Sequence, residues 1–188
     1  MKAVGLLGVA VLVAVWTLPL QVSFGLFSGH MIRHMGLVAV AAPLLVLGFP
    51  RLTAGFAISP LLAAVAEFVV VWGYHLPALR ELSALYTVAL FAEQGMFLMV
   101  GLFVWAGCLR AGGLAGAGGL LLTSMHMTLL GALLTLAPRS LYPLTCSAGL
   151  GDQQLGGMLM LAIGTPIYLV GGLWLVGNML TIGQDETL

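Results

Sequence analysis

Long apolar runs, separated by short connections rich in glycine, proline and polar residues, make up most of this chain. A helix that crosses a bilayer needs about 20 mainly apolar residues. Six runs approach that length, and the connections carry helix breakers such as "GFPR" and "APRSLYP". The pattern predicts an all-α polytopic membrane bundle of about six transmembrane helices, and we expect one transmembrane helical domain over residues 1–188. The expected spans are 3–22, 28–48, 58–75, 83–108, 118–138 and 155–180.

Composition supports lipid as the main solvent of the chain. Of its 188 residues, 61% are hydrophobic and only 6% are charged, with a mean hydropathy of +1.15. Soluble domains carry roughly 25% charged residues, so this chain has too few charges to cover a surface that faces water. The net charge is zero, which gives no reason to expect nucleic acid as a partner.

Basic residues give a weak signal for orientation. With the N-terminus inside, Lys2, Arg51 and Arg110 face the cytoplasm, whereas Arg80 and Arg139 face outward. Because cytoplasmic loops carry the excess of Lys and Arg, we expect a multi-pass protein with a cytoplasmic N-terminus.

Polar residues gather at one end of the predicted bundle, whichever way it is inserted. Because successive helices run in opposite directions, the ends that carry these residues fall on the same side of the membrane. They are His30, His34, His75, Arg80, Arg139, Tyr142, Asp152, Gln153 and Gln154. The orientation above makes this the outer side.

The stretch "SGHMIRHMG" places His30 and His34 four residues apart. Residues at i and i+4 share one face of a helix, so the two imidazoles could hold one ion, and imidazole suits copper, zinc or iron. The alternative is a pair of interfacial histidines that snorkel or cap. Three of the four histidines lie at the same end of the bundle, which favours a metal or haem.

Other polar residues lie deeper in the predicted helices. Ionisable groups within a membrane usually face the bundle interior with a partner, and we expect Arg33 to pair with Glu93 or Glu67. Met31 and Met35 flank the paired histidines and are possible soft ligands for copper, although methionine more often serves as packing. Neither a catalytic triad nor a phosphate-binding loop is evident, so we expect no enzyme activity.

Four blocks of sequence, in this order, resemble those of the CtaG-type cytochrome c oxidase assembly factors over residues 28–175. They are "HMIRHMGLVAVAAPLLVLGFP", "VWGYHLPAL", "SMHMTLLGALLTLAPRSLYP" and "DQQLGGMLM". The resemblance implies a protein of the bacterial inner membrane that helps to mature a haem–copper oxidase of the caa type. It further implies copper binding at the outer face and delivery to cytochrome c oxidase subunits, its partners.

By matched motif, His30, His34, His75, His126, Asp152 and Gln153 take the places of the family's characteristic polar residues. The expected metal ligands are His30, His34, His75 and His126, and the expected supporting or partner-contacting residues are Arg33, Glu93, Arg139, Tyr142, Asp152 and Gln153. Gln94 stands where the family pattern usually has histidine. Two alternatives stay open: a haem-binding electron-transfer subunit, with His75 or His126 as an axial ligand, or a structural accessory subunit of a respiratory complex.

Overall fold

The computed structural model describes residues 2–143 and 149–185, with side chains as far as residue 181. Every regular element in these residues is helical, which confirms the expected all-α fold. In chain order the elements are α1 (Lys2–Thr17), α2 (Leu20–Phe24), α3 (Leu26–Met35), the π-helix η1 (Gly36–Ala41), α4 (Ala42–Gly48), the 3₁₀-helix η2 (Ala54–Phe56), α5 (Pro60–Tyr74), α6 (Pro77–Leu85), α7 (Thr87–Ala111), α8 (Gly113–Leu136) and α9 (Leu150–Asp185).

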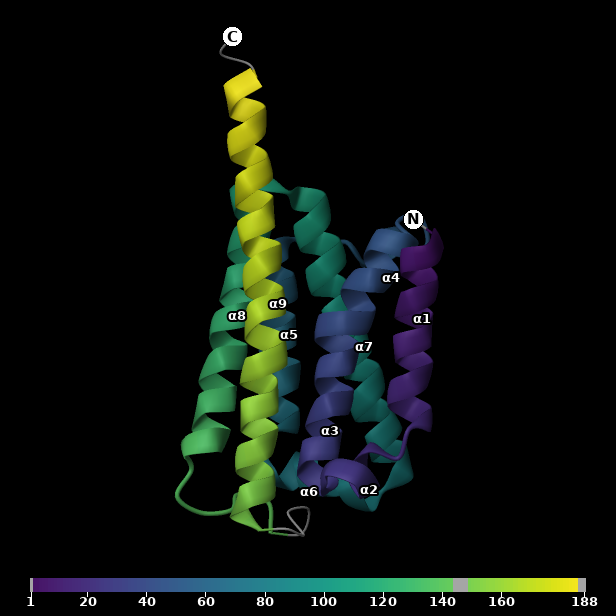
Figure 1. Ribbon diagram of the computed structural model, residues 1–188, viewed down its shortest axis with the longest axis vertical. Coiled ribbons are helices and arrows are strands. Elements are labelled where there is room, and N and C mark those ends of the chain that lie inside the picture. The colour runs from purple at the N-terminus through teal and green to yellow at the C-terminus, as the bar shows by residue number, and fades with distance from the viewer. Residues whose placement is uncertain (1, 144–148, 186–188) are drawn as a thin grey trace.

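The long helices run up and down the bundle, and the short helices α2 and α6 are both found at one end of it (Figure 1). The N-terminus lies at the opposite end, beside α4. Chain direction alternates from α1 through the continuous α3–η1–α4 segment to α5, α7, α8 and α9. Because the helices alternate in direction, the ends that carry the polar residues lie on the same side of the bundle, as expected from the sequence.

Four helices in the described part of the chain are long and apolar enough to cross a membrane, and a fifth span results if α5 and α6, bent by 71°, count as one. The remaining apolar helix, α1, is shorter. The expected number of six is therefore approximate. Several boundaries also differ by a few residues, and two differences lie near prolines: α1 ends at Thr17, shortly before Pro19, and the chain forms the separate helix α6 where a loop was expected.

Proline explains that second difference. Because the ring of Pro77 removes a backbone donor and clashes with the preceding turn, a proline cannot continue α5 but is well placed to begin a new helix. Pro77 is the first residue of α6, and the extended backbone of Tyr86 then separates α6 from α7.

The continuous α3–η1–α4 segment lies inside the bundle, with α1, α7 and α9 packed around it. The π-helical turn leaves one carbonyl available to side chains: Val38 O accepts from Trp105 Nε1 at 3.0 Å and lies 3.2 Å from Tyr168 Oη. Single π-turns of this kind occur often at functional sites. Here the turn fixes α3 against α7 and α9, and so fixes the helix that carries the paired histidines.

Candidate metal centre

Three of the four histidines meet at the end of the bundle that carries α2 and α6. His30 and His34 lie one turn apart on α3, and His75 follows the last residue of α5. The ring centroids are 6.3 Å apart for His30 and His34, 6.1 Å for His30 and His75, and 5.3 Å for His34 and His75. All three side chains are at most 5% exposed.

Local sequence sets the position of His75. Because α5 must end before Pro77, His75 lies at the bend between α5 and α6 with its backbone still near helical geometry. Its ring Nδ1 lies 2.6 Å from Val71 O, one turn back along α5. Since a carbonyl can only accept, Nδ1 carries the proton and the lone pair of Nε2 is free to bind an ion.

Five buried ring nitrogens in this cluster have no hydrogen-bond partner: both nitrogens of His30, both of His34, and Nε2 of His75. A buried polar atom without a partner costs about 1–3 kcal/mol, so such a group calls for an explanation. Imidazole nitrogens bind a metal at about 2.0 Å, which places the centroids of three such rings about 5–6 Å apart. The three measured separations fit or slightly exceed that range.

The three histidines nevertheless do not form a complete coordination site as they stand. Among the described residues, no group of three His, Cys, Asp or Glu side chains is placed so that it could hold a metal ion. The three rings would have to reorient before their nitrogens could share one ion.

Phe97, on α7, forms an apolar wall of the cluster. Its ring stacks on that of His34 with a centroid distance of 4.0 Å and an interplanar angle of 18°, and it lies 6.2 Å from the rings of both His30 and His75. Sequence reasoning missed this residue. The signal was its spacing, one helical turn after Glu93.

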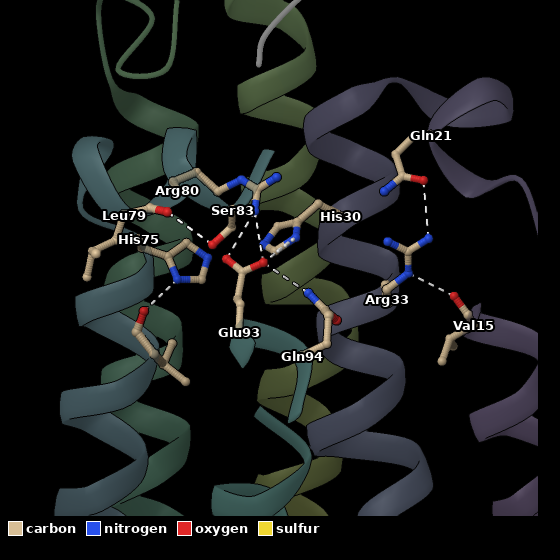
Figure 2. A network of polar contacts seen from close by, with 11 residues as sticks. Val15, Gln21, His30, Arg33, His75, Leu79, Arg80, Ser83, Glu93 and Gln94 are labelled. Atoms are coloured by element: carbon tan, nitrogen blue, oxygen red, sulfur yellow. Dashed lines mark hydrogen bonds and ion pairs between the residues drawn. The ribbon is translucent and has the colours of Figure 1, made fainter. Parts of the chain in front are cut away.

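Glu93 supplies negative charge beside the histidines, and its partner is Arg80. Nη1 of Arg80 lies 3.0 Å from each carboxylate oxygen, and Gln94 Nε2 donates to Oε2 at 3.1 Å. The same Oε2 lies 3.7 Å from Nδ1 of His30 (Figure 2). Arg80 and Glu93 are buried, so their charges compensate each other away from water.

The expected pairing of Arg33 with Glu93 or Glu67 is wrong. Arg33 points away from the histidines: its Nε donates to Val15 O of α1 at 2.8 Å, and its Nη2 donates to the Gln21 side chain of α2 at 3.2 Å (Figure 2). Its guanidinium also lies 5.6 Å from the ring centroid of Trp16. The three-residue step from His30 to Arg33 turns the side chain toward α1, which supplies a carbonyl and an aromatic face, and toward α2, which supplies an amide.

Asp152, in the first turn of α9, caps the start of α3. Its carboxylate accepts from the backbone N–H of Phe27 at 3.0 Å and of Ser28 at 2.9 Å, and from the Ser28 hydroxyl at 2.6 Å. Negative charge and acceptors at a helix N-terminus are stabilising. Asp152 thus fixes the helix turn that precedes His30.

Two other expected supporting residues act through the backbone. The Tyr142 hydroxyl donates to the carbonyl of His75 at 2.7 Å, while its ring stacks on Phe27. Gln153 accepts from Leu141 N–H at 2.7 Å and donates to Leu134 O at 3.1 Å, which ties the end of α8 to α9.

The remaining expected site residues lie apart from the cluster. Met31 and Met35 are fully buried and pack toward Gly156 and Gly164 of α9. Arg139 is exposed beyond the end of α8.

His126, on α8, also lies outside the cluster. Its ring makes an edge contact with Phe68, at a centroid distance of 5.6 Å, and both of its ring nitrogens are buried without a hydrogen-bond partner.

Comparison with known proteins identifies the family. Residues 3–181 match the family described as cytochrome c oxidase caa3 assembly factor (Caa3_CtaG). The comparison with curated proteins found no match, and the comparison with solved structures found none either. The match spans nearly the whole chain, and the chain belongs to this family.

Proposed function

We propose that this member of the caa3 oxidase assembly factor family holds one copper ion through His30, His34 and His75 and passes it to a subunit of the oxidase. The observation that carries the proposal is the group of five buried ring nitrogens without partners, contributed by three rings 5.3–6.3 Å apart. Copper is the cargo in this proposal, and the protein is a carrier rather than an enzyme.

The chemistry of the donors supports copper. Imidazole is a good ligand for copper, and Gln94, where the family usually has histidine, is a poor one. The Gln94 amide instead donates to Glu93. The ligand set that we propose is therefore limited to three imidazoles, and a metal bound by three ligands keeps a position open for an incoming ligand from the receiving subunit.

Glu93 has the place of a residue that orients a ligand. A histidine that binds metal through one nitrogen commonly donates its other N–H to a carboxylate. Oε2 of Glu93 lies 3.7 Å from Nδ1 of His30, so a small rotation of the ring would complete that hydrogen bond and direct Nε2 into the cluster. The negative charge of Glu93 would also offset part of the charge of the ion.

The packing of the cluster favours a single ion over haem. The flat face of Phe97 fills the space beside His34, and its ring lies near His30 and His75 as well. A porphyrin would need a planar slot where this aromatic side chain now packs. We therefore regard haem as a less favoured ligand of this cluster than a single copper ion.

We further propose that the histidine end faces outward, that the N-terminus is cytoplasmic, and that the protein lies in the bacterial inner membrane. The excess of Lys and Arg at the opposite end supports this orientation. Because the cluster is nearly closed to solvent, transfer requires the oxidase subunit to dock at the end of the bundle where α2 and α6 lie.

Metal analysis and an absorption spectrum on one sample, purified in mild detergent without chelator, test the proposal. We expect about one copper per chain and no Soret band. The variants His30→Ala, His34→Ala and His75→Ala should each lose copper, whereas His126→Ala should retain it. A Soret band, or full copper in the His30→Ala/His34→Ala double variant, would contradict the assignment.

A further inference from the structure

A groove of about 560 Å³ opens at the end of the bundle opposite the histidines, between the start of α1 and the loop that follows α4. Its walls are apolar and include Leu6, Phe49 and Leu52. Leu6 is 63% exposed and Leu52 is 79% exposed. Two cationic side chains, Lys2 and Arg51, complete the lining.

The backbone around the groove is held firmly. α1 and α4 approach so closely that a side chain on Gly48 would collide with the backbone of Gly5, and one on Gly5 would collide with the ring of Phe49. From α7, Arg110 Nη2 donates to the carbonyl of Pro50 at 2.6 Å. These contacts fix the loop that carries Arg51 relative to the start of α1.

Among the described residues, the charged side chains that line the groove are both cationic. The carboxylate side chains that the structure describes belong to Glu67 and Glu93 inside the bundle, and to Glu81 and Asp152 at the histidine end. None of these lines the groove, so Lys2 and Arg51 meet no described carboxylate there. An apolar hollow with two cations suits a molecule that combines a hydrocarbon chain with a negative charge.

We propose that this groove binds one anionic phospholipid, with the phosphate group near Lys2 and Arg51 and hydrocarbon against Leu6 and Leu52. Basic residues between helix ends attract anionic lipid headgroups, and each Lys or Arg near the surface strengthens such binding by several-fold. The site does not depend on copper binding, because it lies at the other end of the bundle (Figure 1).

Thermal unfolding of delipidated protein in a neutral detergent tests this site. The probes are phosphatidylglycerol, phosphatidylcholine and inorganic phosphate, titrated separately. We expect phosphatidylglycerol alone to raise the melting temperature. The Lys2→Gln/Arg51→Gln double variant should bind phosphatidylglycerol about 25-fold more weakly, whereas Arg139→Gln, an exposed arginine at the other end, should bind it normally.

A second variant covers the case in which the double variant fails to fold. Leu52 is largely exposed, so Leu52→Asp should fold normally and weaken phosphatidylglycerol binding by placing a negative charge in the groove. Equal stabilisation by phosphatidylcholine, equal stabilisation by inorganic phosphate, or unchanged phosphatidylglycerol binding in Leu52→Asp would each overturn the proposal.

Discussion

Arg80 on α6 holds the carboxylate of Glu93 on α7, with Nη1 3.0 Å from both carboxylate oxygens. This buried pair connects the short helix at the bend to the cluster of histidines, because Oε2 of Glu93 also lies 3.7 Å from Nδ1 of His30. The position of α6 and the charge at the candidate metal centre are therefore linked.

Removing either member of this pair should destabilise the protein strongly. Arg80→Gln leaves Glu93 buried without its cation, and Glu93→Gln leaves Arg80 without its anion; breaking a buried pair in this way costs about 3–5 kcal/mol. The double variant should cost less than the sum of the two single variants, since it leaves no lone charge. The free energy of unfolding, followed by titrating SDS into mixed micelles, measures all three. Additive costs in this double-mutant cycle would show that the two charges are not coupled.

The methionines beside the paired histidines should be dispensable for copper. Met31 and Met35 pack toward α9, so Met31→Leu/Met35→Leu conserves volume and should cost less than about 3 kcal/mol in stability. We expect this variant to retain copper in metal analysis, whereas His34→Ala loses it. Loss of copper from the methionine variant, with stability preserved, would place thioether sulfur among the ligands.

Asp152 should matter through the start of α3 rather than through direct contact with the ion. Asp152→Ala removes the acceptor for two backbone N–H groups and one hydroxyl, and loss of such a cap costs about 1–2 kcal/mol. Because His30 lies in the next part of the same helix, copper affinity should fall as well, as measured by competition with a chelator. Asp152→Asn keeps one acceptor oxygen and should lie between the wild type and Asp152→Ala. An unchanged copper affinity in Asp152→Ala would show that the cap at the start of α3 does not influence the metal centre.

A second buried carboxyl, away from the histidines, gives a prediction for stability alone. Oε1 of Glu67 lies 2.8 Å from the Tyr168 hydroxyl, and its Oε2 has no hydrogen-bond partner. Tyr168→Phe therefore removes the hydroxyl that contacts the Glu67 carboxyl, at a cost of about 1–3 kcal/mol in stability. Tyr168→Phe/Glu67→Met should recover part of that loss. The copper content of both variants should match that of the wild type, because Trp105 still donates to Val38 O and holds the π-turn. A selective loss of copper would show that the contact between Tyr168 and Glu67 supports the metal centre.

Much of the architecture could be predicted because it follows from local rules. Apolar runs of the length needed to cross a bilayer specify helices, and the alternation of their directions brings the polar ends of several helices to the same side. The helical spacing of His30 and His34 likewise places both rings on one face of α3. His75 could be assigned to the same end from the direction of its helix alone.

The contacts between helices could not be predicted in the same way. The sequence does not determine the rotation of α3 about its own axis, so it could not show that Arg80, rather than the expected Arg33, would reach Glu93. That rotation turns Arg33 to α1 and both methionines to α9, and it brings Phe97 of α7 against His34. Nor did hydropathy distinguish α6 from a loop, because its nine residues are too short for a span and include the charged Arg80 and Glu81.

The sequence by itself determined that this chain forms apolar helices with one polar end, because helix formation and burial in lipid depend on local composition and spacing. Only the tertiary structure decided that three imidazoles meet there, with Arg80 and Glu93 beside them. That outcome depends on the packing of residues far apart in the chain. Close approach of helices at glycines, a π-turn and interhelical hydrogen bonds set the rotation of each helix and its position along the bundle axis.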